Sequence, residues 1–366
     1  MAGGSGERFW PLSRKSKPKQ LLPLATEKPM ILESIERITD IIHPEDIFII
    51  TGNLLLEPIR QALDMLPPEN IVAEPYKRNT APCLALGAAF IAAKYAKEFK
   101  PNEISIAVLT ADQKISPNEL FEKTVDEALF YVENNAVLGT IGILPSRPET
   151  GYGYIEVDKP FDYEKHKVQI KKVKQFREKP DVETAKKFLN SGNYLWNSGM
   201  FFWRLDAFID EMKKAIPEVG GKINEMSSCY SKWTGKALPE PLKTVAPIFE
   251  AFPDVSIDFG LMERSDNVVV AKALFDWDDI GSWDSMERVR KVDADGNIIV
   301  GKTALVDVTN SVIVNYSSGK KIITAGVDLD NMVIVVTDDA VLVCPKDKVQ
   351  KVKQVVSIVK KEEKWV

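Results

Sequence analysis

The first twenty residues combine glycines and cations at a spacing that suits a phosphate group. Arg8 and Lys19 follow a glycine-rich turn. The residues of this turn are Gly3, Gly4, Ser5 and Gly6. Glycine N–H groups can converge on a phosphate, while an Arg fork and a Lys point charge supply positive charge. A tight turn beside two solvated cations is the plainer alternative, but the ordered combination favours a nucleoside triphosphate loop.

This loop belongs to neither of the two commonest phosphate-binding motifs. A Walker-type loop ends in Gly-Lys-Ser/Thr, which is missing here, and the dinucleotide fingerprint needs a third glycine that this loop lacks. The cations beside the turn instead suggest that a triphosphate is held for chemistry.

Composition narrows the class of protein. The 366 residues are 45% hydrophobic and 28% charged, and the net charge is −5. These values are typical of a soluble globular protein, and the absence of a basic field makes nucleic acid an unexpected partner. The apolar run at 83–93 is too short to span a bilayer, and the first residues do not resemble a signal peptide. Cys83, Cys229 and Cys344 show no metal or disulfide spacing, so we expect a cytoplasmic protein with no membrane partner.

Helical and strand patterns alternate along the first 150 residues. Helices are expected at 29–42, 54–66, 80–99 and 119–133, and strands at 46–51, 70–73, 104–109 and 136–144. This order predicts an α/β fold with a doubly wound, mixed but mostly parallel, Rossmann-like sheet. Ligands of such sheets bind beyond the carboxyl ends of the strands, where Glu74 and Asp112 fall.

The pattern changes twice along the rest of the chain. Strands are expected at 152–157, 168–178 and 199–203, a helix at 182–190, and helices with loops at 217–255. Beyond residue 296, short apolar runs about ten residues apart indicate a sandwich, a barrel or a small solenoid. Residues 348–361 predict a terminal amphipathic helix whose apolar face needs a partner. We expect one domain at 1–290 and a second at 291–366.

Six further motifs follow the glycine loop in a fixed order. They are the segments 74–82 (EPYKRNTAP), 109–112 (LTAD), 151–155 (GYGYI), 176–180 (FREKP), 196–201 (WNSGMF) and 277–283 (WDDIGSW). Together they resemble the sugar nucleotidyltransferases, most closely the mannose-1-phosphate guanylyltransferases. The resemblance covers about 290 residues. It implies transfer of GMP from GTP to mannose 1-phosphate, giving GDP-mannose and pyrophosphate, with a short β-helix at the C-terminus and a homodimer.

The resemblance also implies roles for the charged residues. Asp112 and Asp279 would form a pair that holds Mg²⁺, although an Asp at a strand end is also a common helix cap. Arg8 would grip the β- and γ-phosphates, and Lys19 would lie near the α- or β-phosphate. Lys179 would neutralise the phosphate of the incoming sugar, the alternative being an exposed strand lysine.

Polar residues without a phosphate role would recognise the sugar and the base. Glu178 and Asn197 would hold sugar hydroxyls, helped by the backbone at Gly153, although a buried Asn can also serve only the backbone. Glu74 could accept hydrogen bonds from the N–H groups of guanine. Asn79 and Thr80 would contact the base or the ribose.

The reaction explains why no proton-abstracting residue is required. A phosphate monoester has a second pKa of about 6 and is already an anion at neutral pH. His43 and His166 lie outside every motif, so we expect them to be structural or exposed. Two anions must instead be brought together by cations and a metal.

Three departures from the family pattern affect what we expect. Gln113 stands where the family usually has His, so the metal turn can hydrogen-bond but not gain charge. The chain starts at the loop, so we expect the sheet to lack the strand that precedes it in the family, with a consequence for activity. No long C-terminal extension follows, so we expect a single activity. The alternatives are the same chemistry on another nucleotide or hexose 1-phosphate, and a non-catalytic regulatory subunit that binds a sugar nucleotide.

Overall fold

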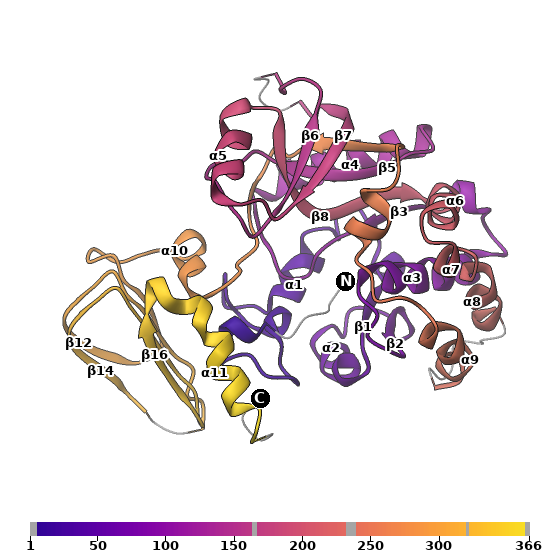
Figure 1. Cartoon of the computed structure of the whole chain (residues 1–366). Helices are drawn as coiled ribbons and strands as arrows, with labels where there is room; N and C mark the ends of the chain where they lie inside the picture. The colour runs from indigo at the N-terminus through magenta and orange to yellow at the C-terminus, as the bar shows by residue number, and fades with distance from the viewer. Residues whose placement is uncertain (1–5, 163–166, 232–238, 320–321, 363–366) are drawn as a thin grey trace.

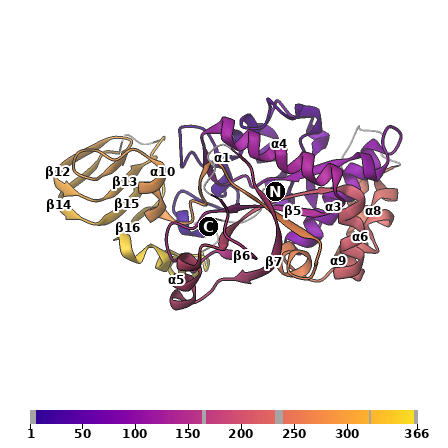
Figure 2. The ribbon, with the colours of Figure 1, turned by 90° about the horizontal axis from the view of Figure 1, so that it is seen from above.

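The chain forms a larger α/β unit and a smaller β-rich unit (Figure 1). This computed structural model describes residues 6–162, 167–231, 239–319 and 322–362. The C-terminal helix α11 (Val352–Val359) runs beside the N-terminal segment in Figure 1. Seen from above, the smaller unit extends from one end of the larger one (Figure 2). Within the described residues, no helix combines the length and the apolar character that crossing a bilayer requires.

A six-stranded mixed sheet forms the centre of the larger unit. Its strands, in spatial order, are β3 (Ser105–Val108), β8 (Tyr194–Arg204), β5 (Leu138–Ile143), β9 (Val268–Lys272), β7 (Ile170–Glu178) and β6 (Gly153–Val157). The predicted α/β class with a mixed sheet is confirmed. The expectation of mostly parallel pairing is wrong for this sheet, where β5 and β9 form the parallel pair. The long strand β8 runs antiparallel to β3, β5 and β6, and the sequence shows this strand only in part.

Two small sheets carry the remaining strands of the larger unit. β1 (Ile49–Gly52) and β2 (Ile71–Glu74) pair in parallel, as the alternating pattern predicts. β4 (Lys114–Ser116) and β10 (Asp276–Asp278) pair antiparallel and bring residue 112 and residue 279 to the same region.

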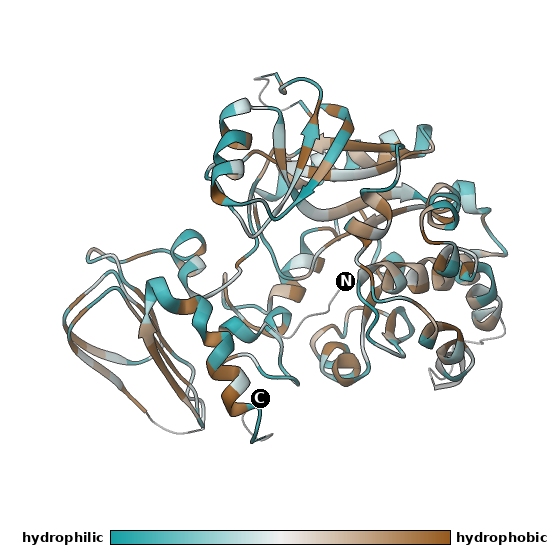
Figure 3. Cartoon of the chain, viewed as in Figure 1, coloured by the Kyte–Doolittle hydropathy of each residue, from teal (hydrophilic) through white to brown (hydrophobic). Residues whose placement is uncertain are grey.

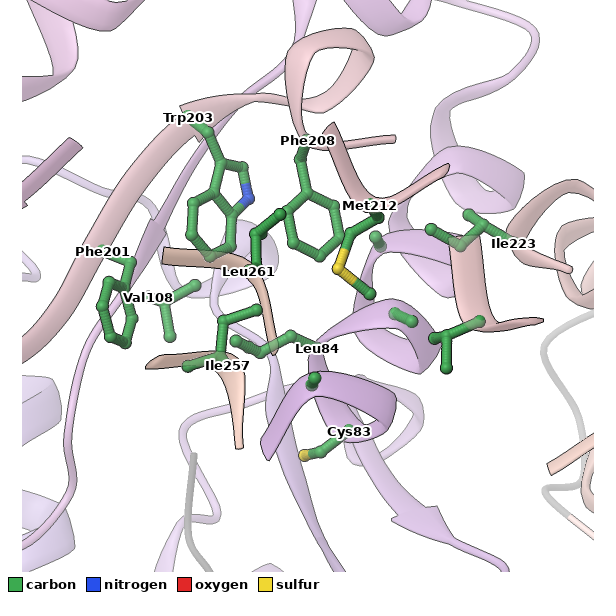
Figure 4. Close-up of a cluster of buried hydrophobic side chains, with 14 of the residues drawn as sticks. Cys83, Leu84, Val108, Phe201, Trp203, Phe208, Met212, Ile223, Ile257 and Leu261 are labelled. Carbon is green, nitrogen blue, oxygen red and sulfur yellow. The ribbon is translucent and has the colours of Figure 1, made fainter. Parts of the chain in front are cut away.

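Helices cover both sides of these sheets. They are α1 (Met30–Glu36), α2 (Leu56–Ala62), α3 (Thr80–Tyr95), α4 (Asn118–Asn134), α5 (Val182–Ser191), α6 (Leu205–Ala215), α7 (Pro217–Gly220), α8 (Ile223–Tyr230), α9 (Pro239–Glu250) and α10 (Met286–Val289). α3 is buried along most of its length because its alanines let neighbouring elements approach closely. Trp203 stacks on Phe208 with ring centroids 4.5 Å apart, and Met212, Ile257 and Leu261 complete this core (Figure 4).

A cavity separates β1 from β3, which do not pair with each other. Its volume is about 470 Å³, and Ile49 and Ile106 line two of its sides. Residues of α1 and α3 line it as well, so the space is bounded by strands on two sides and by helices. Ser34 Oγ and Thr110 Oγ1 belong to lining residues and are buried without a hydrogen bond to any described residue. The cavity is therefore lined in the same way as a position that an interior strand of a sheet occupies.

The smaller unit is a short solenoid, in agreement with the β-helix that the resemblance implies. β11 (Ile298–Val300), β13 (Val312–Asn315) and β15 (Met332–Val336) pair in parallel, and β16 (Val341–Pro345) adds antiparallel to β15. β12 (Thr303–Thr309) and β14 (Thr324–Asp330) form a second parallel pair. Successive turns of the chain thus contribute strands to each of two sheets.

A repeat of 21 residues underlies this solenoid. The pattern T-A-x-V-D-x-x-N-x-V-I-V occurs at 303–314 and again at 324–335. Its corners are Asn310 and Asn331, which adopt φ angles of 50° and 56°. Asn tolerates this left-handed conformation better than most residues because its side chain hydrogen-bonds locally. The repeat is therefore not visible as a six-residue period, because its period is 21 residues.

The two units share a hydrophobic core. Phe9, Trp10 and Trp283 of the larger unit pack in one cluster with Val333 and Val352. The predicted terminal helix is present, but its first turns form the 3-10 helix η9 (Lys346–Lys351) before α11 begins. The ribbon of α11 alternates between apolar and polar residues (Figure 3), which agrees with one face buried on this core.

Candidate active site

Lys19 is the centre of the first group of predicted residues. It begins the short helix η2 (Lys19–Leu21) and is 8% exposed. Its Nζ lies 3.0 Å from Asp112 Oδ2 and donates a 2.5 Å hydrogen bond to the backbone oxygen of Asp279. The ammonium group therefore links the two predicted metal ligands, which lie 167 positions apart in the sequence.

Gly6 is the described part of the glycine turn and lies against Lys19. Its φ angle is +60°, and a Cβ there would come within 2.6 Å of Lys19 Cβ. Both facts favour glycine at this position. Ser13 Oγ donates to Gly6 O at 2.8 Å and fixes the turn. Gly3, Gly4 and Ser5 lie outside the described residues.

Arg8 lies in η1 (Glu7–Phe9), next to the turn that carries Asp279. A Cβ on Gly281 would lie 3.1 Å from Asp279 Oδ2 and 3.5 Å from Arg8 Nη1, so this glycine separates the two side chains without filling the space. Ile280 has a φ angle of 44° and is fully buried. Such a conformation is costly for a β-branched residue and occurs where a site requires it.

The environment of Asp279 favours its neutral form. Burial raises the pKa of its carboxyl, and the charges of Asp278 and Asp112 act in the same direction. A hydrogen bond from Tyr152 and the charge of Lys19 oppose this rise in the pKa. Carboxylates held close together against their repulsion fit a divalent cation, which relieves that repulsion.

In the part of the chain that the structure describes, the predicted metal ligands, Asp112 and Asp279, have no third acidic partner free to join them. Asp278 is occupied elsewhere, since it accepts from Ile280 N at 2.8 Å and pairs with Arg288. Across the described residues, no cluster of three or more Asp, Glu, His or Cys residues could hold a metal. Two carboxylates are sufficient for Mg²⁺ when substrate phosphates and water complete its shell.

Gln113 links the turn that carries Asp112 to its neighbours. Its Nε2 donates to Ser198 O at 2.7 Å, and its Oε1 accepts from Trp277 Nε1 at 2.8 Å. The side chain is 8% exposed, so a charged histidine in this position would need a different set of partners.

A second group contains the predicted sugar-binding residues. Gly153 pairs with Glu178 across β6 and β7, and a Cβ on Gly153 would lie 2.6 Å from Glu178 Oε2. Lys179 Nζ lies 2.8 Å from Glu178 Oε1, and Lys179 adopts a φ angle of 43°. Asn197 Cβ lies 3.6 Å from the same added Cβ, so the Glu178 and Asn197 side chains both lie beside the Gly153 backbone.

Asp258 belongs to this group, and the sequence analysis missed it. It begins the π-helix η7 (Asp258–Met262), and Asn197 Nδ2 donates to its Oδ1 at 2.6 Å. Burial raises the pKa of the Asp258 carboxyl, the Asn197 bond lowers it, and the charge of Glu178 raises it again. The only signal in the sequence is one acid inside the apolar stretch 255–262. Short π-helical turns frequently occur at functional sites.

Tyr152 connects the two groups. Its hydroxyl donates a 2.5 Å hydrogen bond to Asp279 Oδ1, and its backbone oxygen accepts from Lys179 N at 3.3 Å. The ring packs edge-on against Trp196 and Trp277 at centroid distances of 5.2 and 5.3 Å. Tyr152 lies inside a motif that the sequence analysis recognised, but that analysis gave it no role.

Glu74 ends β2, and Asn79 and Thr80 lie at the start of α3. Asn79 Nδ2 donates to Asp254 Oδ1 at 3.1 Å, and Thr80 Oγ1 accepts from Ile257 N at 2.7 Å. These bonds hold the segment that leads into Asp258. Glu74 Oε2 is buried with no hydrogen bond to any described residue, and burial raises the pKa of Glu74 to about 7. An unpartnered buried acceptor is what a ligand N–H group would satisfy.

Comparisons with known proteins agree with this geometry. A family model described as nucleotidyl transferase matches residues 1–296, and one described as a mannose-phosphate isomerase/GMP-like β-helix domain matches 301–358. The chain is 36% identical to the mannose-1-phosphate guanylyltransferase of Escherichia coli K12 over 98% of this chain and 72% of that protein. It is 34% identical to mannose-1-phosphate guanylyltransferase RfbM of Salmonella typhimurium LT2 over 100% of this chain and 72% of that protein.

A solved structure agrees with the fold over nearly the whole chain. The crystal structure described as mannose-1-phosphate geranyltransferase from Thermus thermophilus is 28% identical, covers 98% of both chains and has a TM-score of 0.81. Both the sequence relatives and this fold match extend through the solenoid. The chain therefore belongs to the nucleotidyl transferase family, where its relatives include mannose-1-phosphate guanylyltransferases.

Proposed function

We propose that this protein transfers GMP from GTP to mannose 1-phosphate, forming GDP-mannose and pyrophosphate. The observation that carries the proposal is the convergence of Arg8, Lys19, Asp112 and Asp279, joined through Tyr152 to the group around Gly153. Relatives named mannose-1-phosphate guanylyltransferases support the choice of nucleotide and sugar.

The chemistry is an in-line displacement at the α-phosphorus. A sugar phosphate oxygen forms the new P–O bond, and the bond to the bridging oxygen of the pyrophosphate breaks. Because the attacking phosphate is already an anion, the site needs positive charge rather than a base. Arg8 binds the leaving β- and γ-phosphates, and Lys19 binds near the α- or β-phosphate. Lys179 neutralises the incoming sugar phosphate.

Asp112 and Asp279 would hold a divalent cation, which we propose is Mg²⁺. When bound, it supplies positive charge that stabilises the reacting phosphates. Tyr152 orients Asp279 through its 2.5 Å hydrogen bond. Lys19 links the Asp112 carboxylate to the backbone oxygen of Asp279, and we propose that it also contacts the phosphates.

Substrate recognition is divided between two regions. Glu178 and Asn197 bind hydroxyl groups of mannose beside the Gly153 backbone, and Asp258 orients the Asn197 amide. The unpartnered Glu74 Oε2 accepts from guanine N–H groups, with Asn79 and Thr80 nearby in the chain. The glycine turn that ends at Gly6 contributes backbone N–H groups to the phosphates.

A panel of substrates tests the proposal. The purified protein is incubated with Mg²⁺ and each pair of GTP, ATP, UTP or dTTP with mannose 1-phosphate or glucose 1-phosphate, and pyrophosphate release is followed. We expect GTP with mannose 1-phosphate to exceed every other pair in kcat/KM by at least about tenfold. Preference for another pair would show the same chemistry on another substrate, and binding without turnover would show a regulatory subunit.

Lys179 provides a more specific test. Changing Lys179→Ala removes the cation proposed for the sugar phosphate, so the KM for mannose 1-phosphate should rise by about tenfold while the KM for GTP stays within about twofold. Lys172→Ala is the matched control, because Lys172 is an exposed lysine of β7, the strand that Lys179 directly follows. A rise in the KM for GTP alone would place Lys179 on the other substrate.

Our proposal extends to the organisation of the protein. We propose a catalytic domain at 1–290, a C-terminal domain at 291–366 and a cytoplasmic homodimer. Val306 and Val327 pair in register across β12 and β14 and are 57% and 67% exposed, which supports a protein contact on the solenoid. Light scattering after size-exclusion chromatography should give twice the chain mass of 41.0 kDa.

A further inference from the structure

The C-terminal segment packs directly on the N-terminal turn that carries Arg8. Val349, Val352 and Val356 are buried in the same cluster as Phe9 and Trp283. Lys360 Nζ lies 2.6 Å from Glu7 Oε1 and adds an ion pair beside that cluster. The segment 349–360 is thus fixed against residues 7–9, as the adjacent indigo and yellow ribbons in Figure 1 indicate.

One polar side chain of this segment reaches the site. Gln350 Oε1 accepts a hydrogen bond from Arg8 Nη1 at 3.4 Å, and Gln350 Nε2 donates to Ser282 Oγ at 3.0 Å. Ser282 follows Gly281, which lies between Arg8 and Asp279. The amide of Gln350 therefore joins the Arg8 guanidinium to the turn that carries Asp279.

We propose that Gln350 is a positioning residue, which holds the Arg8 guanidinium in the orientation that binds the triphosphate. This inference rests on the proposed function, in which Arg8 binds the β- and γ-phosphates. A long Arg side chain loses considerable rotamer entropy when it is fixed, and an anchor in the free protein removes part of that cost from binding. Gln350 occupies one N–H of the guanidinium and leaves the others for phosphate oxygens.

The Gln350 side chain must be uncharged to perform this role. An amide orients the guanidinium without cancelling its charge, whereas a carboxylate in the same position would form an ion pair and compete with phosphate. The solenoid unit, which lies outside the sheet that carries the sugar group, thereby contributes to nucleotide binding.

A double-mutant cycle tests the inference. Steady-state KM values for GTP and mannose 1-phosphate, together with kcat, are measured for Gln350→Ala, Arg8→Ala and the double variant. We expect Gln350→Ala to raise the KM for GTP by about three- to tenfold and to leave the KM for mannose 1-phosphate unchanged. In the Arg8→Ala background, the same change should have no further effect, since the group that it positions is gone.

Three further variants sharpen the result. Gln350→Glu should raise the KM for GTP more than Gln350→Ala, although it keeps the size of the side chain. Gln350→Met retains length without the amide and replaces Gln350→Ala if that variant loses stability. Gln354→Ala is the matched control, a glutamine one turn further along that is exposed, and it should behave like the wild type.

The outcomes separate this inference from the proposed function. If the wild type does not turn over GTP with mannose 1-phosphate, the proposed function fails. If it does, and Gln350→Ala raises the KM for GTP equally with and without Arg8, then Gln350 does not act through Arg8 and the inference is overturned. A Gln350→Ala variant that matches Gln354→Ala would overturn it as well.

Discussion

At the scale of single residues, the site depends on two aspartates that are both bound to one ammonium group, Asp112 through its carboxylate and Asp279 through its backbone oxygen. Asp112 and the backbone of Asp279 both contact Lys19 Nζ, and Tyr152 holds the Asp279 side chain. Each carboxylate alone would be an ordinary acidic residue. They can act together on a cation only because the fold brings them close, although they lie far apart in the sequence.

Removing either carboxylate should stop the reaction without unfolding the protein. We expect Asp112→Ala and Asp279→Ala each to lower kcat by about 10²- to 10³-fold, because the one remaining carboxylate could not hold the metal against the phosphates. Pyrophosphate release measures the loss, and circular dichroism checks the fold. Asp276→Ala, an exposed acid of β10, is the control. Near-normal activity of either variant with Mg²⁺ would refute the metal pair.

Glu74 should make stability depend on pH in a defined direction. Burial raises the pKa of Glu74 from 4.5 to about 7 in the folded protein. The unfolded chain therefore ionises first, and the folded state loses stability as the pH rises from about 4.5 to about 7. Glu74→Gln should remove this loss, which we expect to be on the order of 2 kcal/mol for a partly exposed group.

Urea unfolding at several pH values measures this difference. The Glu74→Gln variant should match the wild type near pH 4.5 and become the more stable protein above pH 7, once Glu74 is ionised in both states. A difference between the two proteins that stays constant across this range would contradict the pKa assignment.

At the scale of elements, the corners of the solenoid depend on residues that tolerate positive φ. Asn331→Val should destabilise the protein by about 1 to 2 kcal/mol, because a β-branched residue resists the left-handed conformation at φ 56°. Asn331→Gly should be nearly neutral. Urea denaturation compares the three proteins, and an equal loss for Gly and Val would show that backbone conformation is not the cause.

The sequence predicts elements well where a local pattern is sufficient. The helix beginning at Thr80 and the parallel pairing of β1 with β2 follow from nearby residues, and so does the position of Asp112 after β3. The antiparallel contacts of β8 do not follow from nearby residues, because long-range packing determines which strands pair. The register of the solenoid also depends on contacts between turns, although its 21-residue repeat was available in the sequence.

The same division applies to the candidate site. Residues inside recognisable motifs, such as Lys19 and Glu178, were named in advance, and the structure brings them into two groups. Asp258 and Gln350 lie in segments without a motif, so only their contacts with Asn197 and Arg8 identify them. A side chain that acts through another residue is not marked by a motif in the sequence around it.

At the scale of the whole molecule, the shared core makes the two units interdependent. Phe9, Trp10 and Trp283 pack in the same cluster as Val333 and Val352, so separating the units would expose large apolar side chains. The smaller unit therefore has two roles, since it buries Phe9 and Trp10 and supports the turn that carries Arg8.

Filling the cavity between β1 and β3 should stabilise the larger unit. Gly6 lies against Lys19, which contacts Asp112, and Ala111, the residue before Asp112, lines the cavity. We expect a Val-Val-Ile-Val-Leu segment joined before Met1 to enter the cavity and to add apolar contacts and backbone hydrogen bonds. We expect Tm to rise by more than about 4 °C, as measured by calorimetry.

A Ser-Gly-Ser-Gly-Ser segment of the same length is the control for this prediction, since it offers the backbone without the apolar side chains. Equal Tm values for the two extended proteins would show that the cavity does not receive an added strand. A rise with both segments would indicate that chain length alone is responsible.

The same cavity has a consequence for handling the protein in concentrated solution. Partly unfolded neighbours expose extended apolar stretches, and a space with this shape and lining can capture them through edge-to-edge pairing. Warming a concentrated sample should therefore produce precipitation that depends on heating rate and protein concentration. Turbidity would begin at lower temperatures as the sample becomes more concentrated.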